Sequence, residues 1–164
     1  MLLPTRKAFT MLELTFVIVV IGILSAVAIP KFATNRDDAV ISKAKTTVAA
    51  VRNAVATERQ KRILRGDFTR IYKLSNASGT NQPIFDAFDG DTSNSVLQYP
   101  LQSCKTSTSQ GCWEETVTGT SGAGGRVGEY TYKMPVSGSV VFELKNNRFD
   151  CQVLTDANCI RLTR

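Results

Sequence analysis

The four cysteines are the residues of this sequence best suited to chemistry, and their spacing separates a metal site from disulfides. They form two pairs, Cys104 with Cys112 and Cys151 with Cys159, and seven residues stand between the members of each pair. Thioredoxin-like redox sites and zinc ribbons use C-x-x-C instead. The spacing favours two disulfides formed in an oxidising compartment. Of three possible connectivities we expect the two local loops; four reduced, buried thiols are the alternative.

Other catalytic or metal-binding chemistry finds little support. The chain has no histidine, which excludes a Ser-His-Asp or Cys-His site and removes the commonest nitrogen ligand of zinc. The glycine-rich stretch 119–128 lacks the Lys-Ser/Thr ending of a phosphate-binding loop, so we predict a turn there. No nucleophile stands beside a base. We therefore expect a protein that is not an enzyme.

An acidic segment is the one candidate for a metal ion. Asp86, Asp89 and Asp91 supply oxygen ligands of the kind that calcium prefers. The EF-hand pattern fails, because Asn94 stands where its glycine is needed and Pro100 where its glutamate would be. A solvated loop is the favoured interpretation, with calcium as the alternative.

The most distinctive carboxylate is Glu13, at the edge of a long apolar run. No charged residue occurs from Leu14 to Ile29, and counted from Phe9 the stretch has 21 residues. As a helix it would span about 31 Å, close to the hydrocarbon thickness of a bilayer. Arg6 and Lys7 precede it, so the positive-inside rule leaves the N-terminus in the cytoplasm and exports the rest.

An ordinary secretory signal is the competing interpretation of this segment. Basic residues, an apolar run and Ala26-Val27-Ala28 resemble a signal with an A-x-A cleavage site, which would make Ile29 the mature N-terminus. Against it stands Glu13, because a carboxylate at a membrane edge is costly and usually has a functional partner. The apolar pattern also continues as an amphipathic helix beyond the supposed cut.

The segment R-K-A-F-T-M-L-E-L, Arg6 to Leu14, followed by an apolar run and Pro30, resembles the start of type IV pilins and type II secretion pseudopilins. The resemblance implies cleavage by a prepilin peptidase between Ala8 and Phe9, and methylation of the new N-terminus at Phe9. Alanine replaces the family's usual glycine at the cut. The resemblance also implies that Glu13 is the assembly glutamate and that Pro30 kinks the helix.

The physical chemistry of Glu13 leads to the same role without the resemblance. Cleavage would expose the α-amino group of Phe9, four residues before Glu13 and on the same helix face. In low dielectric each charge needs a partner, in its own chain or in a neighbouring subunit. A carboxylate that only snorkels to the headgroups is the alternative.

Beyond Pro30 the apolar spacing predicts more helix. Val40, Ala44, Val48, Val51 and Val55 are separated by four, four, three and four residues, and Ile63 and Leu64 extend this apolar face. Gly66 is placed to end the helix, and Glu58 can pair with Arg62. The expected helix runs from about Phe9 to Arg65, with residues 9–29 in the membrane.

Basic residues gather where this helix should end, with two aromatic residues among them. They are Arg59, Lys61, Arg62, Arg65, Arg70 and Lys73, interleaved with Phe68 and Tyr72. The helix macrodipole favours cations at this position, which makes a structural role the first interpretation. Contact with nucleic acid is the second interpretation.

The last third alternates as antiparallel strands do. Glu129–Met134, Ser139–Lys145 and Arg148–Leu154 are predicted strands, with turns at 135–138 and 146–147, while Val96–Tyr99 and Trp113–Thr118 are further candidates. The expected fold is α+β, a long N-terminal helix packed on a small antiparallel sheet. The expected divisions are a leader (1–8), the helix (9–65), a loop (66–95) and a sheet domain with disulfides (96–164).

These features together predict a structural subunit of a pilin-like filament in a bacterial inner membrane, single-pass, with a periplasmic C-terminal domain. A pseudopilin of a type II secretion or DNA-uptake system is the favoured class, and a major or minor type IV pilin is the alternative. A secreted protein with an ordinary signal is the third. The implied partners are other pilin-like subunits, the prepilin peptidase, the membrane and an inner-membrane assembly platform.

Overall fold

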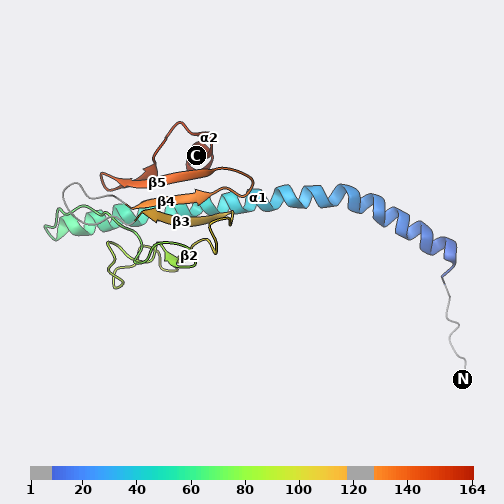
Figure 1. Ribbon diagram of the computed structural model, residues 1–164, viewed down its shortest axis with the longest axis horizontal. Helices are drawn as coiled ribbons and strands as arrows, with labels where there is room; N and C mark the ends of the chain where they lie inside the picture. The colour runs from blue at the N-terminus through green and yellow to red at the C-terminus, as the bar shows by residue number, and fades with distance from the viewer. Residues whose placement is uncertain (1–8, 118–127) are drawn as a thin grey trace, which may run out of the picture. The chain divides into compact units, whose positions relative to one another are not determined.

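The computed structural model describes residues 9–117 and 128–164. These residues form two compact units, one that ends at Asp38 and one that runs from Ala39 to Arg164. Helix α1, Met11–Leu64, belongs to both, and the second unit adds all the strands and helix α2 (Figure 1). The expected α+β class, an N-terminal apolar helix with a C-terminal antiparallel sheet, is confirmed.

Helix α1 begins and ends with recognisable caps. At its start the Thr10 hydroxyl oxygen accepts the backbone N–H of Glu13 at 3.2 Å, the bond expected of a T-x-x-E sequence. At its end Gly66 has φ 76°, and the N–H of Asp67 donates to the carbonyl of Arg62 at 2.9 Å. This is a Schellman cap, which needs a residue that tolerates positive φ. The predicted helix end is therefore correct to within one residue.

The main sheet has four antiparallel strands in the order in which they occur along the chain. They are β3 (Cys112–Val117), β4 (Glu129–Lys133), β5 (Ser139–Lys145) and β6 (Arg148–Cys151). Side chains of β5 alternate between buried and less buried positions, which is the pattern of a half-buried strand. Asn146 and Asn147 form the β5–β6 turn with φ 53° and 59°, as a tight hairpin requires.

Two parts of the strand prediction need correction. Val96–Tyr99 is not a strand; a two-stranded sheet instead pairs β1 (Pro83–Ile84) with β2 (Leu101–Gln102). The predicted last strand is too long, because β6 ends at Cys151. Thr118 and residues 119–127 of the predicted glycine-rich turn lie outside the described residues.

The core of the second unit lies between one face of α1 and the sheet. Ala44, Val48, Val51 and Val55 are buried as predicted, whereas Ile41 takes the place expected of Val40. The sheet contributes aromatic rings that contact one another, such as Trp113 and Tyr132 with centroids 4.9 Å apart and Phe142 and Phe149 at 5.1 Å. Tight packing of rings against small helix residues explains why α1 carries valine and alanine there.

The apolar face of α1 stops earlier than predicted. Ile63 is 45% exposed and Leu64 is 87% exposed, so neither extends the core. The helix reaches its last turn beyond the sheet, where no described element covers these side chains. Their exposure leaves an apolar surface beside the basic residues at the end of α1.

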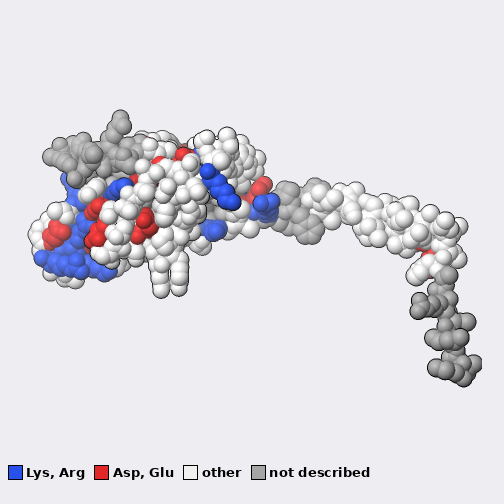
Figure 2. All heavy atoms as spheres, turned by 60° about the horizontal axis from the view of Figure 1, so that its bottom comes forward, with Lys and Arg blue, Asp and Glu red and all other residues white. Residues whose placement is uncertain are grey.

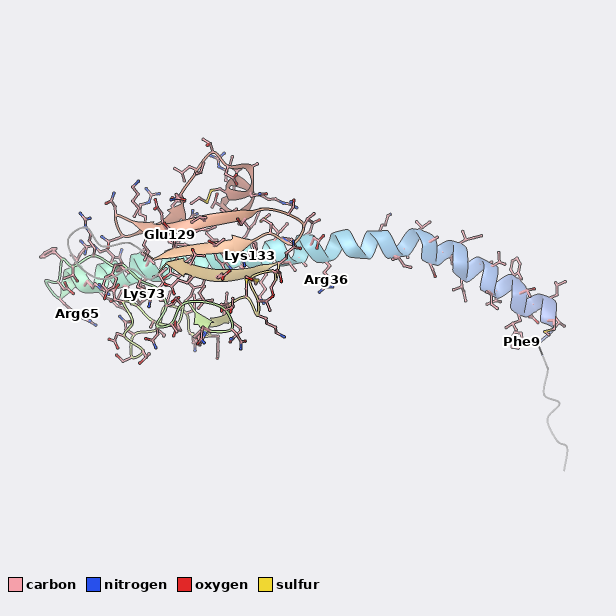
Figure 3. All side chains as sticks on the ribbon, in the orientation of Figure 1. Phe9, Arg36, Arg65, Lys73, Glu129 and Lys133 are labelled. Atoms are coloured by element: carbon pink, nitrogen blue, oxygen red, sulfur yellow. A yellow bond between two sulfur atoms is a disulfide. The ribbon has the colours of Figure 1, made fainter. Side chains whose placement is uncertain are left out.

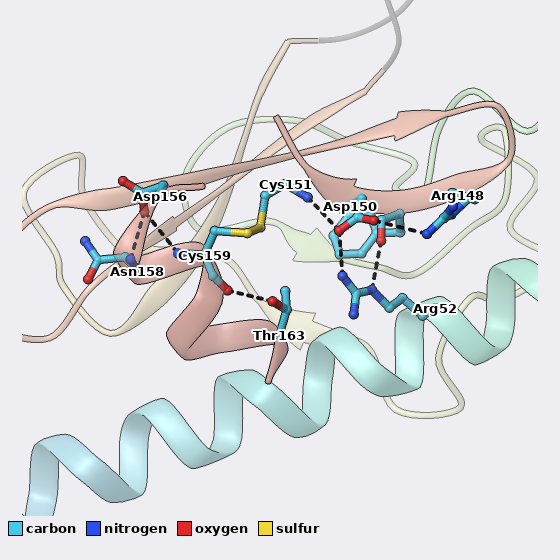
Figure 4. Close-up of a disulfide and its surroundings, with 9 residues drawn as sticks. Arg52, Arg148, Asp150, Cys151, Asp156, Asn158, Cys159 and Thr163 are labelled. Carbon is cyan, nitrogen blue, oxygen red and sulfur yellow. Dashed lines mark hydrogen bonds and ion pairs between the residues drawn. A yellow bond between two sulfur atoms is a disulfide. The ribbon is translucent and has the colours of Figure 1, made fainter. Parts of the chain in front are cut away.

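A second helix, α2 (Ala157–Thr163), follows β6 where only a disulfide loop was expected. The Asp156 carboxylate caps it by accepting the N–H groups of Asn158 and Cys159 at 2.9 and 3.0 Å (Figure 4). Asp156 is a favoured N-cap residue, so the signal was present in the sequence. Cys159 and Leu162 of this helix are buried.

Candidate functional site

The first candidate site is the N-terminal part of α1. Met11–Ile29 is a helical segment of 19 residues, long and apolar enough to cross a membrane, and none of it is buried. Its side chains project around the helix axis, beginning near Phe9 (Figure 3). Such a helix fits a single-pass membrane anchor, although a signal sequence near the N-terminus meets the same criterion.

Glu13 is the one charged residue in this apolar segment. Its side chain is exposed, and no hydrogen bond or ion pair of the described residues reaches its carboxylate. The Thr10 hydroxyl binds only its backbone N–H. Glu13 is therefore positioned by the helix and free to meet a partner outside the chain.

The other N-terminal predictions stay predictions. Ala8 lies outside the described residues, so the cut between Ala8 and Phe9 and the methylation of Phe9 have no structural counterpart here. Helix α1 is continuous through position 30, and the side chain of Pro30 is not among those described. A kink at Pro30 is accordingly still an expectation.

The structure joins the cysteines in the two local pairs that their spacing favoured. Cys104 bonds Cys112 and Cys151 bonds Cys159, each across a separation of eight positions, and no described cysteine is free. The first bridge closes the loop that leads into β3. The second holds α2 against the end of β6 (Figure 4).

Helix α1 also reaches the strand that carries the second bridge. Arg52 donates from Nε to the carbonyl of Phe149 at 3.0 Å and from Nη2 to the Asp150 carboxylate at 2.7 Å. Asp150 in turn accepts the backbone N–H of Cys151 at 3.1 Å. The bidentate reach of arginine thus ties α1, β6 and the disulfide together, an interaction that sequence reasoning missed.

The acidic segment does not form a metal site in the part of the chain that is described. No group of three or more Asp, Glu, Cys or His side chains among those residues is placed to hold an ion. Asp89 accepts the N–H groups of Tyr72 and Lys73 and pairs with Arg62 at 2.7 Å. Asp86 accepts the N–H of Asn76 at 2.9 Å.

Asp91 is engaged separately, with Ser93. The hydroxyl and the backbone N–H of Ser93 donate to its carboxylate at 2.6 and 3.0 Å and hold the pKa of Asp91 below its ordinary value. Asp86, Asp89 and Asp91 thus serve three different local contacts. Among the described residues, proximity along the chain did not bring three such side chains to one point, so these contacts give the calcium alternative no support.

A buried carboxylate that the sequence did not single out lies on β3. Glu115 is 3% exposed, and its Oε1 accepts the hydroxyl of Tyr130 at 3.2 Å. Oε2 has no hydrogen-bond partner among the described residues. Burial raises the pKa of Glu115 to about 7, against the opposing attraction of Lys73 and the Tyr130 bond. Tyr130 itself accepts the N–H of Leu74 at 2.7 Å.

Replacing Glu115 by glutamine is expected to flatten the pH dependence of stability. The folded pKa of about 7 exceeds the unfolded 4.5, so the folded state binds the extra proton between these values. The contribution of Glu115 to the free energy of unfolding is therefore fully present below pH 4.5 and is lost as the pH rises through 7. Allowing for solvent screening, Glu115→Gln should gain about 2 kcal/mol at pH 8 and little at pH 4.5.

Urea unfolding in neutral detergent at several pH values measures this. Glu143→Gln, on strand β5 of the same sheet and only partly buried, is the matched control and should keep the wild-type slope. A wild-type slope in Glu115→Gln would show that the carboxylate is not the titrating group. The signal that could have identified Glu115 is weak, because β3 carries Glu114 and Glu115 side by side and a glutamate in a strand usually faces solvent.

The C-terminal end of α1 carries the predicted basic cluster. Arg62 is drawn inward and pairs with Glu58 at 3.0 Å, as expected from their spacing, and with Asp89 at 2.7 Å. Arg59 donates to the carbonyl of Thr69 at 3.0 Å, which folds the following segment back on the helix. These two arginines have structural roles, as the macrodipole interpretation anticipated.

Comparison with known proteins gives one informative match. The chain is 50% identical over 50 residues to the type IV narrow pilus major component PilA5 of Thermus thermophilus. These residues are 30% of this chain and 43% of the relative, so the match spans less than half of the relative's length. No family model matches the chain, and no solved structure matches it.

Proposed function

We propose that this chain, a type IV pilin-like protein, is a structural subunit that assembles into a filament through its N-terminal helix. The 50-residue identity to a pilus component supports its place in the type IV pilin family. The observation that carries the proposal is the segment Met11–Ile29, a strongly apolar helix whose one charged residue is Glu13 and none of which is buried. An apolar surface of this size needs either lipid or other subunits to cover it.

The assembly role follows from Glu13 and the new N-terminus together. After cleavage before Phe9, the α-amine and the Glu13 carboxylate lie on one helix face. Helices packed side by side in a dry filament core let each carboxylate meet a neighbour's amine, which satisfies both charges. The second unit, with its own core and two disulfides, then forms the outer layer of the filament.

Two filament classes remain as candidates. The sequence pattern led to a pseudopilin of a secretion or DNA-uptake system. The relative is named as the major component of a narrow pilus, which supports a pilus subunit as the second candidate. Abundance and surface exposure of the assembled filament discriminate between them, because a pilus extends outside the cell. The proposed partners are like subunits, the prepilin peptidase and an inner-membrane assembly platform.

The mature N-terminus tests the whole proposal. Mass spectrometry of the membrane-extracted protein should find a chain that begins at Phe9 and carries one added methyl group. A chain that begins at Ile29 would instead establish an ordinary secretory signal and refute the pilin-like role.

The variant Ala8→Asp should abolish processing, because a charged side chain cannot enter a peptidase pocket built for a small residue. We expect at least a tenfold drop in processed protein, about 1.4 kcal/mol in the cleavage barrier. Ala8→Gly is the matched control and should be processed at least as well as the wild type. Normal trimming of Ala8→Asp on a gel would place the cut elsewhere.

A further inference from the structure

The end of α1 holds most of the net charge of the chain. Residues 59–73 contain six basic residues and one acidic residue, a net charge of +5, against +6 for the entire sequence. Figure 2 shows Lys and Arg side chains gathered at this end of the second unit, and Arg65 and Lys73 lie there in Figure 3. The charge is therefore concentrated on one surface.

Part of this charge is already used inside the fold. Arg62 is paired with Glu58 and Asp89, Arg59 binds the Thr69 carbonyl, and Lys73 donates to the carbonyl of Asn76 at 2.8 Å. Lys61, Arg65 and Arg70 differ from these. They are exposed and form no ion pair with any described residue.

Large apolar side chains stand exposed among these three cations. Leu64 is 87% exposed, Phe68 is 71% exposed and Ile63 is 45% exposed. Lys61, Leu64 and Arg65 are spaced at i, i+3 and i+4, which puts them on one helix face. The bond from Arg59 to Thr69 holds the segment that carries Phe68 and Arg70 against the last turns of α1. We call these six residues, 61, 63–65, 68 and 70, the basic-apolar patch.

The helix macrodipole does not account for the patch. It favours cations in the last turn of α1, but Arg70 lies beyond the helix, and a dipole gives no reason to expose leucine and phenylalanine. The one acidic residue of the segment 59–73, Asp67, lies beside the patch, and its carboxylate accepts the N–H of Thr69 at 2.8 Å. The patch therefore presents cations and apolar groups to something outside the described chain.

We propose that the basic-apolar patch binds the surface of an anionic lipid bilayer. Lipid phosphates pair with Lys61, Arg65 and Arg70, and the side chains of Leu64 and Phe68 insert at the boundary between headgroups and acyl chains. The phosphates of single-stranded nucleic acid would pair with these cations equally well. Single strands also bind by stacking their bases on several aromatic side chains, however, and Phe68 is the one aromatic residue of the patch. Ile63 and Leu64 have no partner on a nucleic acid. The combination thus favours lipid.

The test uses the full chain held in nanodiscs of phosphatidylcholine, so that α1 is already anchored. The nanodiscs are immobilised, and vesicles of phosphatidylcholine with or without phosphatidylglycerol are passed over them. Empty nanodiscs give the background. We expect binding of the phosphatidylglycerol vesicles alone, and weaker binding as salt is raised.

Three sets of substitutions separate the patch from general charge. Lys61→Gln with Arg65→Gln and Arg70→Gln should weaken binding about a hundredfold, about fivefold for each cation. Leu64→Ser with Phe68→Ser should weaken it about tenfold with the charge intact. The control removes three exposed cations elsewhere, by Lys105→Gln, Lys145→Gln and Arg164→Gln, and should stay within about twofold of wild type.

Three results would overturn the proposal. Equal losses of vesicle binding in the patch and control variants would show that binding depends only on the net charge of the protein. Unchanged vesicle binding by the Leu64→Ser, Phe68→Ser variant would show that these apolar side chains do not enter the bilayer. An oligonucleotide that binds through the same cations while phosphatidylglycerol vesicles do not would assign the patch to nucleic acid. Filament assembly, measured by crosslinking in the same variants, is expected to be unchanged and reports separately on the proposed function.

Discussion

Substitution of Glu13 by alanine is expected to reduce filament assembly about a hundredfold while leaving membrane insertion and the fold of the second unit intact. In the assembled helices the Glu13 carboxylate would form an ion pair with the α-amino group of a neighbouring subunit. Removing one partner of an ion pair in low dielectric costs about 3 kcal/mol or more. Among the described residues the substitution removes no hydrogen bond or ion pair, because none of them binds the Glu13 carboxylate. Crosslinking of subunits in isolated membranes measures the effect.

Two further variants at Glu13 distinguish charge from shape. Glu13→Gln keeps the size of the side chain and should assemble as poorly as Glu13→Ala. Glu13→Asp keeps the charge and should retain part of the filament assembly of the wild type. The N-cap at Thr10 persists in all of them, because Thr10 binds the backbone N–H and not the side chain. Undiminished oligomers in Glu13→Ala would rule out the assembly role.

Loss of the two disulfides is the second large expected effect, on stability rather than assembly. Each bridge closes a loop with a separation of eight positions. In the chain-entropy model such a loop restricts the unfolded chain by about 2.5 kcal/mol, so both bridges together contribute about 5 kcal/mol. That is a large share of the stability of a small domain.

Thermal unfolding of the full chain in neutral detergent tests this. Cys104→Ser with Cys112→Ser, and Cys151→Ser with Cys159→Ser, should each lower the melting temperature by about 10 °C. Reduction of the wild type should lower it by more than either pair of substitutions. A reduced protein that melts at the oxidised temperature would contradict the prediction, and peptide mapping without reductant identifies the bonded partners.

Several features were predictable because they depend on local chain properties. The three- and four-residue spacing of Ala44, Val48, Val51 and Val55 defines one helix face wherever that helix packs, and these four residues are buried. The bounds of β5 match the prediction at both ends, since alternation and the Asn146-Asn147 turn are local signals. The cysteine pairs were predictable because short loops limit the geometry available to them.

The incorrect predictions share a different origin. Val96–Tyr99 has the composition of a strand, but β1 pairs with the short β2, Leu101–Gln102, which begins two residues further on. Ile63 and Leu64 continue an apolar pattern past the point where the sheet ends. In both cases the outcome depends on whether a segment distant in sequence packs against these residues, and a local pattern does not contain that information.

The sequence by itself determined the apolar N-terminal segment with its single carboxylate and the amphipathic continuation of the helix, and it favoured the two local disulfides without excluding other pairings, because charge, periodicity and short loops act within a few residues. Tertiary structure alone decided the rest. It separated Asp86, Asp89 and Asp91 into three local contacts, buried Glu115 beneath Tyr130, and left Leu64 and Phe68 exposed among free cations. Burial and ion pairing depend on which distant segments meet, and that is a property of the packed chain.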